Sequence, residues 1–275
     1  MSKKLIFIFL IDVILLVVAS KYCKYIYDVE LQRAIFTSEL EEFSKENENP
    51  VFKIGKIVLY SSANVVDNSD GKLEDIDISE FTDIAIYIDN RSVVKAITPE
   101  NTIKEIYIDN IKITSNSDAG KKILNYKNPK EFGKYTALEN YENEKIPFKV
   151  LTTNNEISKN DLSQNVFCTD CSNPLTLGFV NKNFITKGKV SDTSGQLLFD
   201  GSIFKNANVD LEQLSGKIEF YIHIKNNLGE NFICNVVLDN DLKKNEETLL
   251  SGYSIDIDEP EGQIYNFLKV SEDKK

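Results

Sequence analysis

Alternation of apolar and polar residues after Pro50 constrains the fold more than any other feature of this sequence. In the run TIKEIYIDNIKI, Ile106 and Ile108 face one way from an extended strand, whereas the neighbouring tyrosine and aspartate face the other way. Many short runs of this kind follow, separated by turn signals such as NSDG, DTSG and NNLGE. Short strands joined by turns predict a mainly β protein, and we expect an antiparallel β-sandwich.

The five residues IYIDN occur twice, at 86–90 and 106–110. In both copies, alternation places the isoleucines in the core and the tyrosine and aspartate on the opposite face. We expect two strands of one sheet, with a bulge or break at the second Asp-Asn because that strand continues into IKI. The alternative is that Asp89 and Asp109 share a metal ion, which requires neighbouring strands in register.

The clearest hairpin is predicted at residues 217–240, where two β-rich runs flank Asn226–Gly229. Further upstream, the polar stretch at 152–165 is a candidate boundary between two halves of the β region. One continuous composite domain is the other option. The expected segments are a signal-anchor transmembrane segment (1–27), an amphipathic stalk helix (28–50), two β-sandwich halves (51–155 and 156–270) and a frayed tail (271–275).

The N-terminus has the layout of an export signal, with two lysines before the apolar run Leu5–Ala19. A helix of that length rises about 22 Å, which is short of the roughly 30 Å hydrocarbon core. The next residues, SKYCKYIY, extend it, so we predict a signal-anchor helix from Leu5 to Ile26. Cleavage near VVAS is the alternative. The short basic start favours a single-pass protein of the cell membrane, with a cytoplasmic N-terminus and an extracytoplasmic bulk.

Asp12 is an ionisable residue in the middle of this apolar run. Such a group is costly in a membrane, so it is a functional candidate, either for pairing with a second helix or as the acidic residue of a pilin helix. A pilin-like subunit is therefore an alternative, although Phe7 stands where the leader-cleavage glycine is expected.

Residues 28–50 predict a stalk helix that ends before Pro50. Its apolar residues recur at helical spacing. They are Val29, Phe36, Leu40 and Phe43.

Three cysteines and the single histidine form a candidate metal set. Cys168 and Cys171 have C-x-x-C spacing, while His223 and Cys234 lie on the two arms of the predicted hairpin. Three thiolates and one imidazole are a legitimate zinc set, although zinc sites usually contain two close pairs and this one has one. A disulfide between two of these cysteines, or plain half-buried thiols, are the alternatives. No other cofactor is expected.

A calcium site is less well supported by the acidic stretch VDNSDGKLEDID. In EF-hand register Val66 would take the first ligand position, where it cannot bind. We therefore predict a hairpin-like turn.

Charge and missing motifs narrow the function classes. The net charge of −11 argues against nucleic acid, because a binder needs Lys and Arg to replace the counterions of phosphates. No G-x-S-x-G is present, and neither Arg33 nor Arg91 follows Cys234, as a sortase-type transpeptidase requires. We predict a protein that is not an enzyme.

The motifs PVFKIGKIVLYSSANV, FTDIAIYIDN, NTIKEIYIDNIKI and CTDCSNPLTLGFVNKN resemble a group of uncharacterised signal-anchored proteins of low-G+C Gram-positive bacteria. The resemblance spans most of residues 30–255. It implies a bacterial, membrane-tethered, β-rich protein and implies no activity.

We therefore expect a membrane-anchored protein that binds or assembles at the bacterial cell surface, with a sheet edge as the docking site for a protein partner. A pilin-like subunit of an export or adhesion fibre is the first alternative. A cell-envelope enzyme is the second.

Overall fold

The chain divides into two compact units, Met1–Asn49 and Pro50–Lys275, which are described separately. The computed structural model describes residues 16, 18–27, 30–34, 50–90, 97–127, 135–151, 165–169, 174–190, 202–214, 216–240, 253–256 and 265–270.

The first unit is helical where it is described, at 16, 18–27 and 30–34. Its described side chains are exposed, and Arg33 Nη1 donates a hydrogen bond to Glu30 Oε1 at 3.1 Å, one turn earlier. Among the described residues, no helix combines the length and apolar character needed to cross a membrane. Most of the expected anchor and most of the expected stalk lie outside those residues, so both stay predictions.

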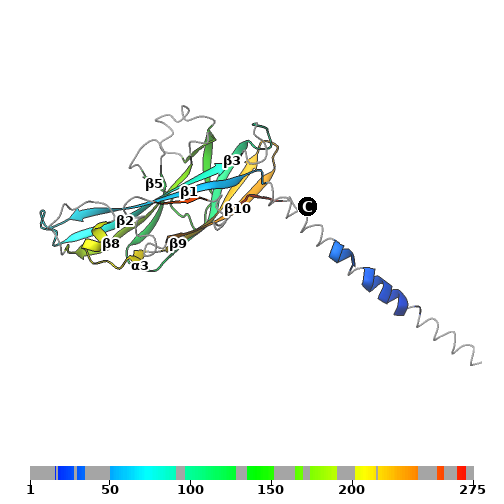
Figure 1. Ribbon diagram of the computed structural model, residues 1–275, viewed down its shortest axis with the longest axis horizontal. Coiled ribbons are helices and arrows are strands. Elements are labelled where there is room, and N and C mark those ends of the chain that lie inside the picture. Colours follow the sequence, from blue (N-terminus) through cyan, green and yellow to red (C-terminus); the bar gives the residue numbers. More distant parts are fainter. Residues whose placement is uncertain are drawn as a thin grey trace, which may run out of the picture. The chain divides into compact units, whose positions relative to one another are not determined.

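In its described residues, the second unit contains two six-stranded sheets and two short helices. Figure 1 shows how these elements are arranged. The first sheet has the order β11-β1-β2-β8-β4-β5, and the second has the order β12-β10-β9-β3-β6-β7. The strands of the first sheet are β1 (Lys53–Asp67), β2 (Ile76–Asp89), β4 (Lys121–Lys127), β5 (Tyr135–Ala137), β8 (Leu175–Gly188) and β11 (Tyr253–Asp256). Those of the second are β3 (Ile103–Ser115), β6 (Ile146–Leu151), β7 (Val166–Cys168), β9 (Gly216–Asn226), β10 (Asn231–Asn240) and β12 (Leu268–Val270). The helices are α2 (Ser202–Asn206) and α3 (Leu211–Leu214).

The prediction of a mainly β fold is confirmed, but the expectation that all strands pair antiparallel is wrong. The first sheet is antiparallel throughout, whereas β6 and β7 of the second sheet pair in parallel, with Val150 opposite Phe167. Parallel neighbours need a crossover of about a dozen residues or more. The polar stretch 152–165 between β6 and β7 is long enough to provide one.

Strands from both predicted halves of the β region are interleaved in each sheet. β8 lies between β2 and β4 in the first sheet, and β3 and β6 lie between β9 and β7 in the second. Residues Pro50–Lys275 accordingly form one compact unit.

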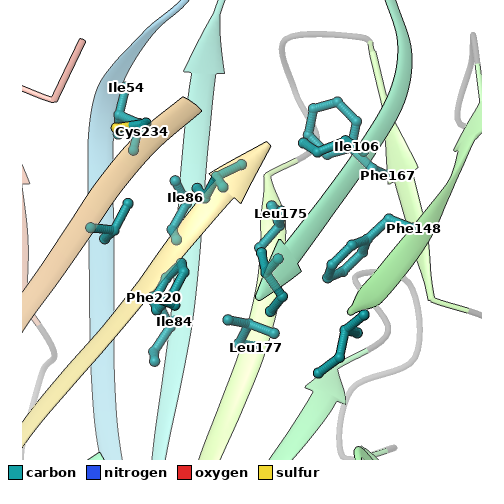
Figure 2. Close-up of a cluster of buried hydrophobic side chains, with 14 of the residues drawn as sticks. Ile54, Ile84, Ile86, Ile106, Phe148, Phe167, Leu175, Leu177, Phe220 and Cys234 are labelled. Atoms are coloured by element: carbon teal, nitrogen blue, oxygen red, sulfur yellow. The ribbon is translucent and has the colours of Figure 1, made fainter. Parts of the chain in front are cut away.

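The two sheets share one large hydrophobic cluster, which we call the main core (Figure 2). Ile84 and Ile86 of β2 meet there with Phe220 of β9 and Cys234 of β10. At one end, the ring of Phe52, just before β1, makes an edge contact with Phe232 at 5.1 Å between centroids. Strict alternation in β2 and β9 produces this arrangement, because every second side chain faces the opposite sheet.

The IYIDN copies have the predicted faces but not the predicted sheet. Ile106 and Ile108 are buried, and the second Asp-Asn coincides with a register shift between Asp109 and Lys112, where Asn110 has a φ of +51°. The predicted bulge or break in this strand is therefore confirmed. However, the first copy lies in β2 of the first sheet and the second in β3 of the second sheet, so one sheet does not hold both. A metal shared by the two aspartates is excluded, because the strands are not neighbours.

A second, smaller hydrophobic cluster, the distal core, lies at the far ends of β1, β2 and β8. Helices α2 and α3 contribute to it, and the rings of Phe184 on β8 and Phe204 on α2 meet edge to face at 6.4 Å. Its buried members are Ala63, Ile76, Ile78, Phe184, Val190, Ile203, Phe204 and Leu214.

The predicted hairpin-like turn joins β1 to β2. The carboxylate of Asp67 accepts hydrogen bonds from the Ser69 amide at 2.8 Å and the Gly71 amide at 2.7 Å. Hydrogen bonds from Ser69, first its hydroxyl and then its amide, hold the pKa of Asp67 below its usual value. Asp67 thus stabilises the turn itself.

Candidate binding face of the second sheet

The β9–β10 hairpin places His223 and Cys234 on opposite faces of the second sheet. His223 pairs with Ile233, and Cys234 pairs with Ile222. Neighbouring positions on a strand point in opposite directions. Cys234 therefore faces the main core as a free buried thiol, while His223 is half-buried on the outer face.

Of the two other members of the candidate zinc set, the structure describes only the backbone of Cys168. The backbone of Cys168 is in β7, and β9, β3 and β6 separate β7 from β10 by roughly 19 Å, at about 4.8 Å per strand. No group of three or more His, Cys, Asp or Glu side chains placed to hold a metal occurs among the described residues. Cys171 and the side chain of Cys168 lie outside the description, so a role for that pair stays a prediction.

His223 belongs instead to a row of side chains that crosses the outer face of the second sheet. Residues directly opposite each other in neighbouring antiparallel strands project to the same face. Successive pairings run from β6 through β3, β9 and β10 to β12. We call these five residues the outer row: Pro147, Tyr107, His223, Ile233 and Leu268.

Tyr107 is held on both sides of its ring. The imidazole of His223 stacks on it with centroids 4.3 Å apart and planes at 5°, and Lys145 Nζ lies 3.4 Å from the ring centroid. The imidazole and the ammonium group cannot occupy one face at these distances, so they lie on opposite faces. Burial, followed by the nearby charges of Asp109 and Glu105, raises the pKa of the Tyr107 phenol.

A hydrogen bond fixes the histidine ring. His223 Nε2 and Asp109 Oδ1 are 2.9 Å apart, across β9 and β3, and Tyr221 lies at a tilted 6.4 Å from the imidazole. Asp109 is the aspartate of the second IYIDN copy. The repeated motif therefore does contribute to a side-chain cluster, as an orienting acceptor for the histidine.

Polar residues border the outer row on both sides. Asp109, Tyr221 and Asn235 form one bordering row. Glu105, Lys225 and Asn231 form the other. An apolar and aromatic centre with a polar rim is the usual anatomy of a protein interface. The tyrosines and the histidine give this face rigid, amphipathic side chains.

The sequence could have indicated part of this face. The run FIC at 232–234 breaks strict alternation, and it marks Ile233 as an apolar residue pointing outward. Pro147 and Leu268 give no such signal, since only the pairing of distant strands brings them into the row.

A second polar cluster is buried in the first sheet, between the main core and the distal core. Glu80, which is 0% exposed, and Thr82 follow Ile78 of the distal core and precede Ile84 of the main core along β2. Thr82 Oγ1 donates to Glu80 Oε1 at 3.3 Å, and the Ser61 and Thr82 hydroxyls are 2.8 Å apart. Burial raises the pKa of Glu80 to about 8, against lowering effects of Thr82 and Lys122.

The sequence carries a signal for this cluster, which the expected site residues do not include. Glu80 and Thr82 are in phase with the core isoleucines of β2, so alternation alone assigns them to the buried face.

Comparisons of the chain with protein-family models, with curated proteins and with solved structures found no match. Function is therefore inferred from the chain's own geometry.

Proposed function

We propose that this chain is a binding or assembly protein of the bacterial cell surface, with a β-sandwich head that a signal-anchor helix tethers outside the membrane. The head binds a protein partner and performs no catalysis. The N-terminal layout supports the tether, and the outer row supports the binding role.

The outer row is the observation that carries the binding role. It combines half-buried Tyr107, His223, Ile233 and Leu268 with exposed Pro147 on five neighbouring strands. Stacking and the bond from His223 to Asp109 immobilise its aromatic part, so little side-chain entropy is lost when a partner covers it.

The outer face of the second sheet is a better candidate for the docking surface than a sheet edge, which the sequence had suggested. The outermost strands β5, β7 and β12 have three residues each, and β11 has four. Very short edge strands are a common device that discourages strand addition.

Site-specific crosslinking in intact cells tests the binding role. A photoreactive amino acid at position 233 samples the outer row. The same group at exposed Val66, near the end of β1, is the matched control. We expect a discrete adduct from position 233, absent from position 66 and competed by purified protein but not by its Ile233→Lys variant. Equal adducts from both positions, or competition by Ile233→Lys, would contradict the proposal.

The tether is tested separately by the intact mass of the mature protein and by its fractionation. An uncleaved chain in the membrane fraction, with its head sensitive to protease added outside the cell, is expected. Cleavage near Phe7 would support the pilin-like alternative instead.

A further inference from the structure

Glu80 has one carboxyl oxygen in use and one without a partner. Oε1 accepts the hydrogen bond from Thr82, whereas Oε2 is buried and has no hydrogen-bond partner. Directly opposite on β8, Asn181 is 1% exposed, and its Oδ1 is also buried without a partner. Glu80 and Asn181, which lie opposite each other on neighbouring strands, therefore each have a buried oxygen that accepts no hydrogen bond.

A single proton on Glu80 would supply a donor to this pair of acceptors. A carboxylate and an amide oxygen can both only accept hydrogen bonds, so an ionised Glu80 leaves both atoms unsatisfied. A protonated carboxyl group has an O–H to donate, and its other oxygen still accepts the bond from Thr82. An unsatisfied buried polar group costs about 1–3 kcal/mol, and more if it is charged.

Among the described residues that face Glu80 from the neighbouring strands, none donates a hydrogen bond to its Oε2. From β1 the facing residues are Ser61 and Ala63, which do not titrate. From β4, the charge that acts on Glu80 is Lys122, but its ammonium group donates to the carbonyl oxygens of Ser117 and Ala119 at 2.7 and 2.6 Å.

The described buried side chains of the two short helices are apolar. Ile203 and Phe204 of α2 and Leu214 of α3 belong to the distal core. Ionisation would therefore place a charge between two hydrophobic clusters.

We propose that Glu80 carries a proton in the folded protein, shares it with Asn181 on the neighbouring strand, and acts as a pH-sensitive link between the two cores. Loss of that proton in mildly alkaline conditions introduces a charge at the junction and loosens the distal core, with α2 and α3, while the main core stays folded.

The direct test is a carbon-detected NMR titration of the side-chain carboxyl groups of the full chain from pH 5 to 9.5. One carboxyl signal should titrate near pH 8, and it should be missing from the Glu80→Gln variant. Thr82→Val removes a hydrogen bond that favours the ionised form, so its titration midpoint should move upward. A Glu80 signal that titrates between pH 4 and 5 would overturn the proposal without any need for a variant.

Hydrogen exchange tests the conformational part. After correction for intrinsic rates, protection of the distal ends of β2 and β8 should fall at least about tenfold between pH 6 and 9, relative to β9 and β10. Glu80→Gln, which keeps a donor for Asn181, should abolish this difference. A uniform change across both cores, or the same pH dependence in Glu80→Gln, would contradict the link.

Discussion

At the residue scale, Cys234 shows how burial controls chemistry. Its side chain is 2% exposed, and burial raises its pKa to about 12. The thiolate is the reactive form, so Cys234 should be inert in the native state. In a Cys168→Ser/Cys171→Ser double variant, we expect Cys234 to react with a thiol reagent at pH 8 at least about a thousandfold more slowly than exposed Cys23. Comparable rates for the two thiols in the folded protein would contradict this assignment.

Glu80 makes stability depend on pH in the direction opposite to most carboxyl groups. Its folded-state pKa of about 8 lies above the ordinary value of 4.5. Its stabilising contribution is therefore complete below pH 4.5 and is lost as the pH rises toward 8, by up to about 5 kcal/mol. We expect the free energy of unfolding of the native chain, measured with urea, to fall across this range relative to Glu80→Gln.

The matched control is Glu219→Gln. Glu219 pairs with Lys217 at the surface, and the hydrogen bond from Lys217 lowers its pKa. The Glu219→Gln substitution should change the pH dependence of the free energy of unfolding only slightly. That change should be confined to pH values below the ordinary pKa of a glutamate. If the free energy of unfolding of the native chain changed with pH between 5 and 8 in the same way as that of Glu80→Gln, Glu80 would not gain a proton on folding.

The residues of the outer face show which part of the candidate site the sequence predicts and which part it does not. Alternation correctly assigns Tyr107 and Asp109 to the outer face, because the rule concerns only neighbours along one strand. The contact of Asp109 with His223 depends on the register of β3 against β9, over 114 positions of sequence. No local pattern encodes that register, so the sequence alone groups His223 with the cysteines and not with Asp109.

At the scale of elements, the approach of the segment before β4 to β8 depends on Gly120. Its φ is +74°, and a Cβ there would lie 2.1 Å from Asn181 Oδ1 and 3.0 Å from the carbonyl oxygen of Lys182. Gly120→Ala should lower the free energy of unfolding by more than about 2 kcal/mol, because it adds a clash to the strain of a positive φ. Thermal and urea unfolding measure this effect.

Gly71 in the β1–β2 turn provides the control for Gly120. Its φ is +85°, yet a Cβ would meet no atom within 4 Å. Gly71→Ala should therefore show only the conformational term, about 1 kcal/mol. Equal losses for the two alanine variants would mean that β8 can move away from Gly120 at little energetic cost.

The sequence predicts the long strands better than it predicts which strands pair with one another, because pairing joins segments that are distant in the sequence. The long strands β2 and β9 have a clear period of two, whereas three-residue strands such as β5, β7 and β12 are too short to show one. The two IYIDN copies illustrate the same limit. The pattern defines which face of a strand is buried, and either sheet of a two-sheet core satisfies it equally.

At the scale of the whole β unit, the polar layer at Ser61, Glu80 and Thr82 divides the hydrophobic interior into two clusters of unequal size. The main core draws on both sheets, so its loss removes the contacts that hold the sheets together. The distal core draws on the ends of β1, β2 and β8 and on two short helices. Such a division predicts two regions of different local stability within one compact unit.

Two phenylalanine truncations separate these regions. Phe204→Ala removes a fully buried ring from the distal core, and Phe220→Ala removes one from the main core. Each should cost about 3–5 kcal/mol at its own site. We expect Phe204→Ala to reduce hydrogen-exchange protection in the distal ends of β1, β2 and β8 while β9 and β10 stay protected.

Phe220→Ala should instead reduce protection throughout both sheets, because β9 lies at the centre of the second sheet and packs across the main core. If Phe204→Ala lowers protection in β9 and β10 as much as in β8, the two clusters unfold as one. In that case Glu80 would sit inside a single cooperative core, and its ionisation would lower the protection of both clusters together rather than release the distal end alone. The same exchange experiment thus decides whether the buried polar layer acts as a boundary within the fold.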